Sequence, residues 1–344
     1  MSRYPLFDRG RIHLRSLHDR GHDLTPDACW PLREAVGKYE HPEFPELMDL
    51  IAAARRAGRP VVLMMGAHPI KLGLSRYFVD LLERGIVTHV ATNGAGIIHD
   101  YELSLGCGTS ESVARWIRRG QFGLWSETGR LNEIIREAAA NEEGLGEAVG
   151  RCIEQGQHRC RELSLAAAAW RAGVPLTCHV SIGSDIIHSH ANCNGAALGD
   201  ASYTDFLIFT HSISKLEGGV YLNVGSAVTG PEVYLKALSM VRNVARQEDR
   251  EVRKFTTAVF DLVALPSDFR QGPPGKEHPM YYYRPWKTIL VRTVADGGTS
   301  YYFQGDHQQT IPTLWEGLVN RLCDPGDSAP GASASRAAAD HTSR

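Results

Sequence analysis

Several features that would define a functional class are scarce or missing in this chain. No apolar run approaches the roughly 18 residues of a membrane-spanning helix, and the first residues lack the apolar core of a secretory signal. The formal net charge is only −2, so nothing points to nucleic acid or to an anionic membrane. The seven cysteines are dispersed and form no Cys-x-x-Cys pair, which favours a reducing compartment. We therefore expect a cytoplasmic protein without membrane or nucleic-acid partners.

What the chain does contain is an alternation of helical and strand patterns. Helical periodicity marks residues 46–57, 72–85, 166–173, 205–218 and 311–322. Apolar runs typical of buried parallel strands occur within residues 60–68, 87–96, 174–183, 219–228 and 254–262. This alternation predicts an α/β fold, a Rossmann-like and mostly parallel sheet with helices on both faces. Residues 286–303 alternate in a way that predicts a hairpin near one sheet edge.

Three regions follow from the composition. Residues 1–45 are rich in charge, histidine and proline, and we expect an irregular N-terminal arm with little core of its own. Residues 46–323 carry the α/β pattern and form the predicted domain. Residues 324–344 are small, polar and rich in alanine and serine, which predicts a disordered tail.

The predicted strands end in polar or glycine-rich turns. Ligands of open parallel sheets bind beyond the carboxyl ends of the strands, so these turns predict one shared crevice. Small residues there let the backbone approach a pyrophosphate, although the usual Gly-x-Gly-x-x-Gly fingerprint is absent. The alternative is that each glycine serves only its own tight turn. The turns are Gly66-Ala67-His68, residues 92–96, Gly183-Ser184-Asp185, residues 223–226 and Thr256-Thr257-Ala258.

A series of segments between about residues 60 and 318 resembles the deoxyhypusine synthase family of NAD-dependent enzymes. These enzymes oxidise an amine to an imine and then transfer it. The segments are residues 66–96, 190–200, 219–228 and 256–261, then Pro285-Trp286-Lys287 and Gly305-Asp306. The resemblance implies a homotetramer with NAD as cofactor. The contacts it implies for NAD, together with the turns above, are Gly66, Ala67, His68, Thr92, Asn93, Gly94, Gly96, Asn194, Gly225, Ser226, Thr257, Ala258, Asp261, Gly305 and Asp306.

The same resemblance makes Lys287 the candidate nucleophile. An amine reacts only when it is unprotonated, and burial beside the Trp286 ring would lower its pKa. Asp200 falls in the 190–200 segment and is the candidate group for holding a substrate ammonium. The alternatives are a solvated lysine that enters an edge strand and, for Asp200, a helix N-cap.

Residues 93–111, NGAGIIHDYELSLGCGTSE, resemble part of the NAD-dependent ornithine cyclodeaminase domain. Enzymes with that domain also oxidise an amine on NAD, but they expel ammonia and close a ring. The residues carried over are His99, Asp100 and Glu102. They offer a base, an orienting carboxylate and a second charge for an ammonium group. The alternative is that both acids only favour a helix N-terminus.

One histidine cluster leaves two interpretations open. His179, Asp185, His188 and His190 lie within twelve residues, a density that can bind zinc or iron. We favour polar lining of the substrate pocket, in which Asp185 or Asp200 holds an ammonium group, and we assign no metal.

These observations predict an NAD-dependent amine-oxidising transferase that passes an aminoalkyl group through Lys287. The alternative is an NAD-dependent deaminase or cyclodeaminase of a basic amino acid such as ornithine. A metal-dependent hydrolase built on the histidine cluster, and a nucleotide-binding regulatory protein without chemistry, are two further hypotheses. The expected partners are a small amine or amino acid and further copies of the same chain.

Overall fold

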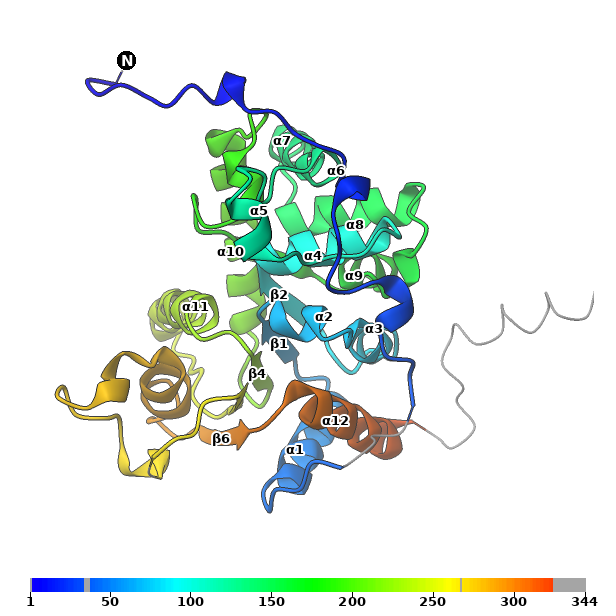
Figure 1. Cartoon of the computed structure of the whole chain (residues 1–344). Helices are drawn as coiled ribbons and strands as arrows, with labels where there is room; N and C mark the ends of the chain where they lie inside the picture. The colour runs from blue at the N-terminus through cyan, green and yellow to red at the C-terminus, as the bar shows by residue number, and fades with distance from the viewer. Residues whose placement is uncertain (1, 34–37, 267, 324–344) are drawn as a thin grey trace, which may run out of the picture.

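The computed structural model describes residues 2–33, 38–266 and 268–323. Its centre is one all-parallel sheet of six strands in the order β3-β2-β1-β4-β5-β6 (Figure 1). The strands are β1 (Val61–Met65), β2 (His89–Asn93), β3 (Leu176–His179), β4 (Val220–Val224), β5 (Thr256–Asp261) and β6 (Thr299–Gln304). The predicted Rossmann-like class is confirmed. The strand order reverses between β1 and β4, and this is where such sheets open a crevice.

Successive strand residues belong to two cores, one on each face of the sheet. Val61, Leu63 and Met65 join the first core, whereas Val62 and Met64 join the second. Every residue of β1 is therefore buried, which is why its sequence is a continuous apolar run.

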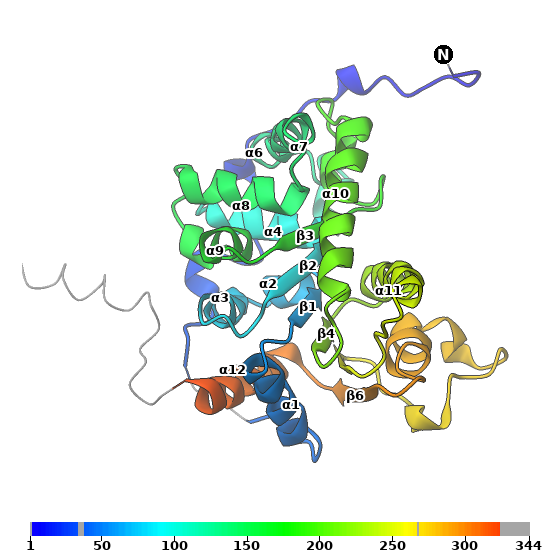
Figure 2. The same cartoon turned by 180° about the vertical axis from the view of Figure 1, so that it is seen from behind.

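Helices cover both faces (Figure 2). The first face carries α1 (Phe44–Arg56), α2 (His68–Lys71), α3 (Ser75–Glu83), α9 (Leu165–Ala172) and α12 (His307–Leu322). The second carries α10 (Gly195–Ile213), α11 (Thr229–Gln247) and the π-helical η8 (Pro285–Arg292).

The connection from β2 to β3 is long and helical. It contains α4 (Gly94–Ser104), α5 (Val113–Ile117), α6 (Ser126–Gly129), α7 (Leu131–Ala140) and α8 (Leu145–Gln155), followed by α9. The N-terminal arm runs past this block in Figure 1 and is pinned to it by backbone bridges from Arg15 to Trp125 and from Leu24 to Thr109. Leu17 of the arm is fully buried. The arm therefore forms one wall above the carboxyl ends of the strands.

The predicted hairpin at residues 286–303 is wrong. Residues 285–292 form η8, and β6 follows as a parallel neighbour of β5. Trp286, Ile289 and Leu290 recur at helical spacing and are all buried in the second core. The segment Thr256-Thr257-Ala258 is also not a turn, because it lies inside β5.

The predicted tail at residues 324–344 lies outside the described residues. Within the described ranges, no helix is both long and apolar enough to cross a bilayer.

Candidate functional site

A cavity of about 220 Å³ lies at the carboxyl ends of β1, β2 and β3. Helix α4 supplies one side of it, the turn after β3 supplies another, and the arm and the loop before α5 close it. It is lined by Arg20, Lys71, Ala95, Ile98, His99, Glu102, Ser110, Glu111, Val113, Phe122, Ser184, Asp185 and Ile186. The structure thus brings together His99, Glu102 and Asp185, three residues predicted from separate patterns.

His99 is a half-buried base in this cavity. Its Nδ1 lies 2.6 Å from the Thr109 Oγ1, and within the described residues its Nε2 has no hydrogen-bond partner. Burial lowers the pKa of His99 to about 4, an effect only partly opposed by the nearby Glu102 carboxylate. The imidazole is therefore neutral at pH 7, and it can accept a proton at Nε2.

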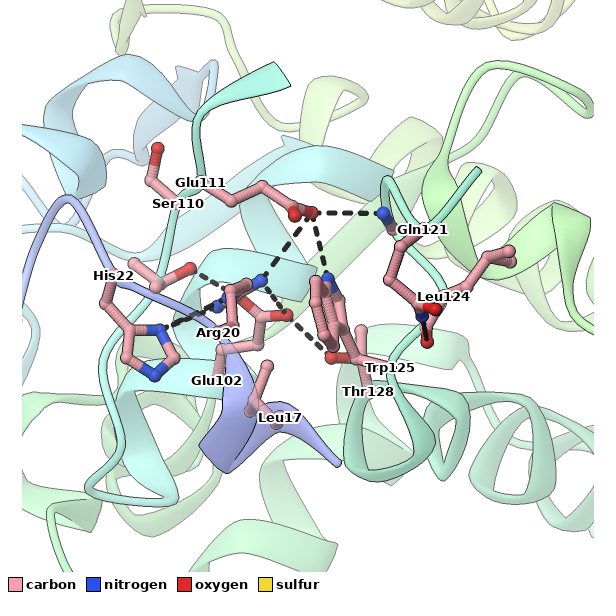
Figure 3. A network of polar contacts seen from close by, with 12 residues as sticks. Leu17, Arg20, His22, Glu102, Ser110, Glu111, Gln121, Leu124, Trp125 and Thr128 are labelled. Carbon is pink, nitrogen blue, oxygen red and sulfur yellow. Dashed lines mark hydrogen bonds and ion pairs between the residues drawn. The ribbon is translucent and has the colours of Figure 1, made fainter. Parts of the chain in front are cut away.

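Glu102 is the centre of a buried polar network (Figure 3). Its two oxygens accept the Arg20 guanidinium in a bidentate pair, at 3.1 and 2.7 Å. The hydroxyls of Thr109 and Thr128 also donate to it, each at 2.6 Å. The side chains of Arg20 and Glu102 are each 1% exposed, so this is a desolvated ion pair with its lone pairs occupied. Glu102 has no free oxygen for a ligand and acts on the site through its neighbours.

Two other carboxylates in the cavity do have a free oxygen. Among the described residues, the Asp185 Oδ2 and the Glu111 Oε2 are buried without a hydrogen-bond partner; the His188 Nε2 lies 3.8 Å from the Asp185 Oδ2, beyond hydrogen-bond distance. Burial raises the pKa of Asp185 to about 6, and burial is also the main cause that raises the pKa of Glu111. Unpaired buried acceptors are costly, so each is a ready position for a ligand's N–H groups. Lys71, at the end of α2, adds an exposed cation to the same cavity.

Asp100 is not in this cavity. Its carboxylate accepts hydrogen bonds from the backbone N–H groups of Leu165 and Ala166 and from the Ser164 hydroxyl. It thereby caps the N-terminus of α9, which explains a fully buried acid without any ligand.

Asp200 is exposed on α10 and does not line the cavity. The N-cap of that helix is Asn194, whose side chain accepts from the N–H groups of Ala196 and Ala197. The N-cap alternative for Asp200 is therefore wrong. Asn194, predicted to contact NAD, has its side-chain oxygen in use as the helix cap.

The clustered histidines separate in space. The His188 Nδ1 accepts from the backbone N–H groups of Gly183 and Asp185, which shapes the turn after β3. The His190 Nε2 lies 2.7 Å from the Gly123 carbonyl. His179 bonds to Thr177 within the sheet. In the part of the chain that the structure describes, no three histidine, cysteine or acidic side chains gather to hold a metal ion.

Trp286 and Lys287 begin η8, which packs on β5 and α11. The Lys287 side chain is 3% exposed, and its ammonium lies 3.7 Å from the centre of the Tyr281 ring. The Lys287 ammonium therefore packs against an aromatic ring in a cation–π contact. The Trp286 indole donates to the Gly272 carbonyl. Two strands separate β5 from β2, roughly 14 Å at a strand spacing of about 4.8 Å. His99 lines the cavity described above, and Lys287 is not among the residues that line it.

The predicted cofactor residues fall into three groups. Those after β1, β2 and β4 do lie at the carboxyl ends of the strands: Gly66, Ala67, His68, Asn93, Gly94, Gly96, Gly225 and Ser226, with Thr92 inside the end of β2. Asp261, Gly305 and Asp306 follow or end β5 and β6, and Asp306 caps α12. Thr257 and Ala258 lie deep within β5, where the Thr257 hydroxyl donates to the Ile289 carbonyl.

The turns that follow β1 and β4 pack closely against each other at two glycines. A Cβ on Gly66 would overlap the Gly225 carbonyl, and Gly225 has a φ of +61°, which only glycine adopts without strain. Among the described residues, two buried polar atoms at the same end of the sheet lack hydrogen-bond partners, the Thr92 Oγ1 and the His307 Nδ1. Small residues and polar atoms without partners at a topological switch point fit a dinucleotide.

Three residues that build the site were not singled out from the sequence: the cavity residues Glu111 and Arg20, and Thr109, which contacts His99 and Glu102. Glu111 and Thr109 belong to the Gly-Thr-Ser-Glu end of the 93–111 segment, so the resemblance could have indicated them. Arg20 lies in the arm, 82 residues from its partner Glu102, and no motif marks it.

Together, the sheet and the cavity define a Rossmann-like α/β protein with a polar cavity beyond the carboxyl ends of β1, β2 and β3. No family model and no curated protein matches the sequence. Solved structures match in fold, including both kinds of protein that the sequence resembles. A variant of AgrE bound to L-arginine is 13% identical with a TM-score of 0.50, over 83% of this chain and 34% of AgrE.

Two further solved structures match with lower scores. AgrE in complex with ornithine and NAD⁺ is 12% identical with a TM-score of 0.47, over 82% of this chain and 33% of AgrE. A protein assigned as a deoxyhypusine synthase from Entamoeba histolytica is 9% identical with a TM-score of 0.43, over 81% of this chain and 87% of that protein. This chain thus spans about a third of AgrE, and the likeness to the arginine-bound AgrE variant shows a shared fold alone.

Proposed function

We propose that this chain is an NAD-dependent enzyme that oxidises the amino-bearing carbon of a small basic amino acid held in the His99 cavity. The observation that carries the proposal is one cavity with a neutral histidine and two carboxylate oxygens that lack partners. AgrE, which shares the fold, has been solved with ornithine and NAD⁺.

The two free carboxylate oxygens support a substrate with ammonium groups. Burial raises the pKa of Asp185 and of Glu111, so each carboxylate is protonated more easily than an exposed acid. A bound ammonium group would stabilise their ionised forms. Lys71 at the same cavity would pair with the carboxylate of an amino acid. A substrate with two ammonium groups and one carboxylate therefore matches the charges that line the cavity.

His99 supplies the base. Oxidation of an amine requires a neutral nitrogen, so a proton must leave the substrate ammonium first. The Nε2 of His99 can take that proton, because Nδ1 is engaged with Thr109 and the ring is neutral at pH 7.

NAD, when bound, supplies an acceptor for the hydride that leaves the amino-bearing carbon. The residues that fit it are the two closely packed glycines, Gly66 and Gly225, together with the buried polar atoms of Thr92 and His307. Addition of water to the resulting substrate imine would release ammonia.

Deamination is supported better than aminoalkyl transfer. Transfer requires a neutral lysine beside the substrate, whereas Lys287 packs against the Tyr281 ring and does not line the His99 cavity. Lys287→Arg decides between the two outcomes, since arginine keeps the charge but cannot form the covalent imine. Loss of all turnover in a folded Lys287→Arg variant would restore the transferase hypothesis.

We propose in addition that the protein is a homo-oligomer, as the deoxyhypusine synthase resemblance implies. Exposed apolar side chains on two neighbouring helices support this, namely Tyr203 and Leu207 of α10 and Met240 and Val244 of α11. Light scattering during size-exclusion chromatography measures the state directly, and a monomer at micromolar concentration would contradict it.

The test of the proposed function is a screen of basic amino acids and diamines with NAD, following NADH absorbance and ammonia together. Asp185→Asn should raise KM about tenfold or more for the active substrate, because one charged hydrogen bond is worth ~1.5–3 kcal/mol. Asp249→Asn, an exposed acid after α11, is the matched control. No turnover of any amine by a folded, NAD-bound protein would refute the proposal.

A further inference from the structure

We propose that Thr109 and Arg20 are positioning residues that hold His99 in the tautomer with its proton on Nδ1. Their catalytic meaning rests on the proposed function, whereas the tautomer itself is a property of the free protein. The proton positions follow from the buried network around Glu102 in Figure 3 and from the contact of the His99 Nδ1 with the Thr109 hydroxyl.

The Glu102 carboxylate forms a bidentate ion pair with the Arg20 guanidinium. A carboxylate has no proton to give, so every neighbour within hydrogen-bond distance must donate to it. The Thr109 hydroxyl lies 2.6 Å from the Glu102 Oε2, and its single proton is therefore committed to that oxygen.

The same hydroxyl oxygen lies 2.6 Å from the His99 Nδ1. Since the Thr109 proton points at Glu102, its oxygen can only accept here, and the Nδ1 must carry the hydrogen. A neutral imidazole has one N–H group, so the Nε2 holds a lone pair. The network leaves this lone pair free of any partner in the described residues, at the wall of the cavity.

Arg20 connects this arrangement to the N-terminal arm. The guanidinium sits among the two Glu102 oxygens, the Gly108 carbonyl and the His22 ring, and its side chain is 1% exposed. Without the guanidinium, Glu102 would lose the two hydrogen bonds that hold its carboxylate beside the Thr109 hydroxyl, and the constraint on His99 would be lost. Docking of the arm is thus part of what sets the protonation pattern of the site.

The test is nitrogen NMR of the histidine rings in the full-length protein, with His99→Gln used to assign the His99 signals. The wild-type protein should show a protonated Nδ1 and an unprotonated Nε2 for His99 at pH 7. Thr109→Val removes the hydroxyl at nearly constant volume, and His99 should then shift to the Nε2-protonated form or to a mixture. Thr109→Ser keeps the hydroxyl and should restore the wild-type pattern.

The matched control is Thr128→Val. Thr128 is equally buried and also donates to Glu102, at 2.6 Å, but it does not contact His99. A change of tautomer in Thr109→Val but not in Thr128→Val is the expected result. A wild-type ring protonated on Nε2, an unchanged ring in Thr109→Val, or equal changes in both variants would each overturn the proposal.

Activity gives a separate readout. With an active substrate, Thr109→Val should lower kcat about 100-fold, the lower range for a lost general base, and Thr109→Ser should recover most of it. If no amine is turned over but the tautomer shifts as expected, the proposed function fails and the positioning role stands. If turnover is found and Thr109→Val leaves both kcat and the tautomer unchanged, the positioning role fails alone.

Discussion

Removal of the Arg20 charge should be among the most destabilising single changes in this chain. Arg20→Met keeps much of the aliphatic side chain but leaves Glu102 as a buried carboxylate with two hydroxyl donors and no counter-charge. Breaking a buried ion pair from one side costs about 3–5 kcal/mol, a large share of the ~5–15 kcal/mol by which domains are stable. The expected result is a clear fall in the denaturant midpoint of unfolding.

The measurement is equilibrium unfolding in guanidinium chloride, followed by circular dichroism and tryptophan fluorescence. Trp125 reports the site, because the Arg20 guanidinium lies 5.7 Å from the centre of its ring. Arg15→Met is the control from the same arm. Its pair with Asp19 is 48% and 49% exposed, and such pairs contribute about 0–1 kcal/mol.

A double-mutant cycle separates the ion pair from general damage. Glu102→Gln combined with Arg20→Met should cost clearly less than the sum of the two single changes, since neither then leaves a buried charge. An Arg20→Met protein with a wild-type midpoint and unchanged Trp125 emission would refute the account of this network.

Two further predictions concern stability. Burial lowers the pKa of both His89 and His179 to about 3, so protonation of either ring favours the unfolded chain. Their contribution to the free energy of unfolding is therefore complete above pH 6.5 and is lost as the pH falls from 6.5 towards 3. In His89→Gln the free energy of unfolding should depend less steeply on pH in this range, and an unaltered dependence would contradict this. Gly199→Ala in α10, where a Cβ meets nothing within 4 Å, should stabilise the protein by about 0.5–1 kcal/mol, whereas Gly66→Ala should destabilise it by about 1–3 kcal/mol. Thermal unfolding checks both signs. A Gly66→Ala protein with wild-type stability would show that Gly66 and Gly225 do not pack closely.

The sheet could be predicted because buried parallel strands leave a strong local signal. Every residue of β1 is buried, so its sequence is an unbroken apolar run. Residues 286–303 show the limit of such patterns. Short segments rich in Ile, Val and Thr fit a strand and a buried helix equally well. Here the packing of Trp286, Ile289 and Leu290 against α11 favours the helix η8 over a strand.

The site was predictable where one element carries it. His99 and Glu102 are three residues apart on α4 and so share a helical face, which a motif can record. Asp100 lies between them and must therefore point elsewhere, and it caps α9. Arg20 pairs with Glu102 across 82 residues, and no local pattern encodes such a contact.

The central claim is that His99 acts as the base in NAD-dependent oxidation of a basic amino acid. The most direct measurement is the rate of ammonia release by the wild-type protein and by His99→Gln, at saturating NAD and active substrate. We predict that the variant binds NAD like the wild type. It should release ammonia at least about 100-fold more slowly, which is the effect expected for loss of a general base. Equal rates of ammonia release in the two proteins would contradict the account.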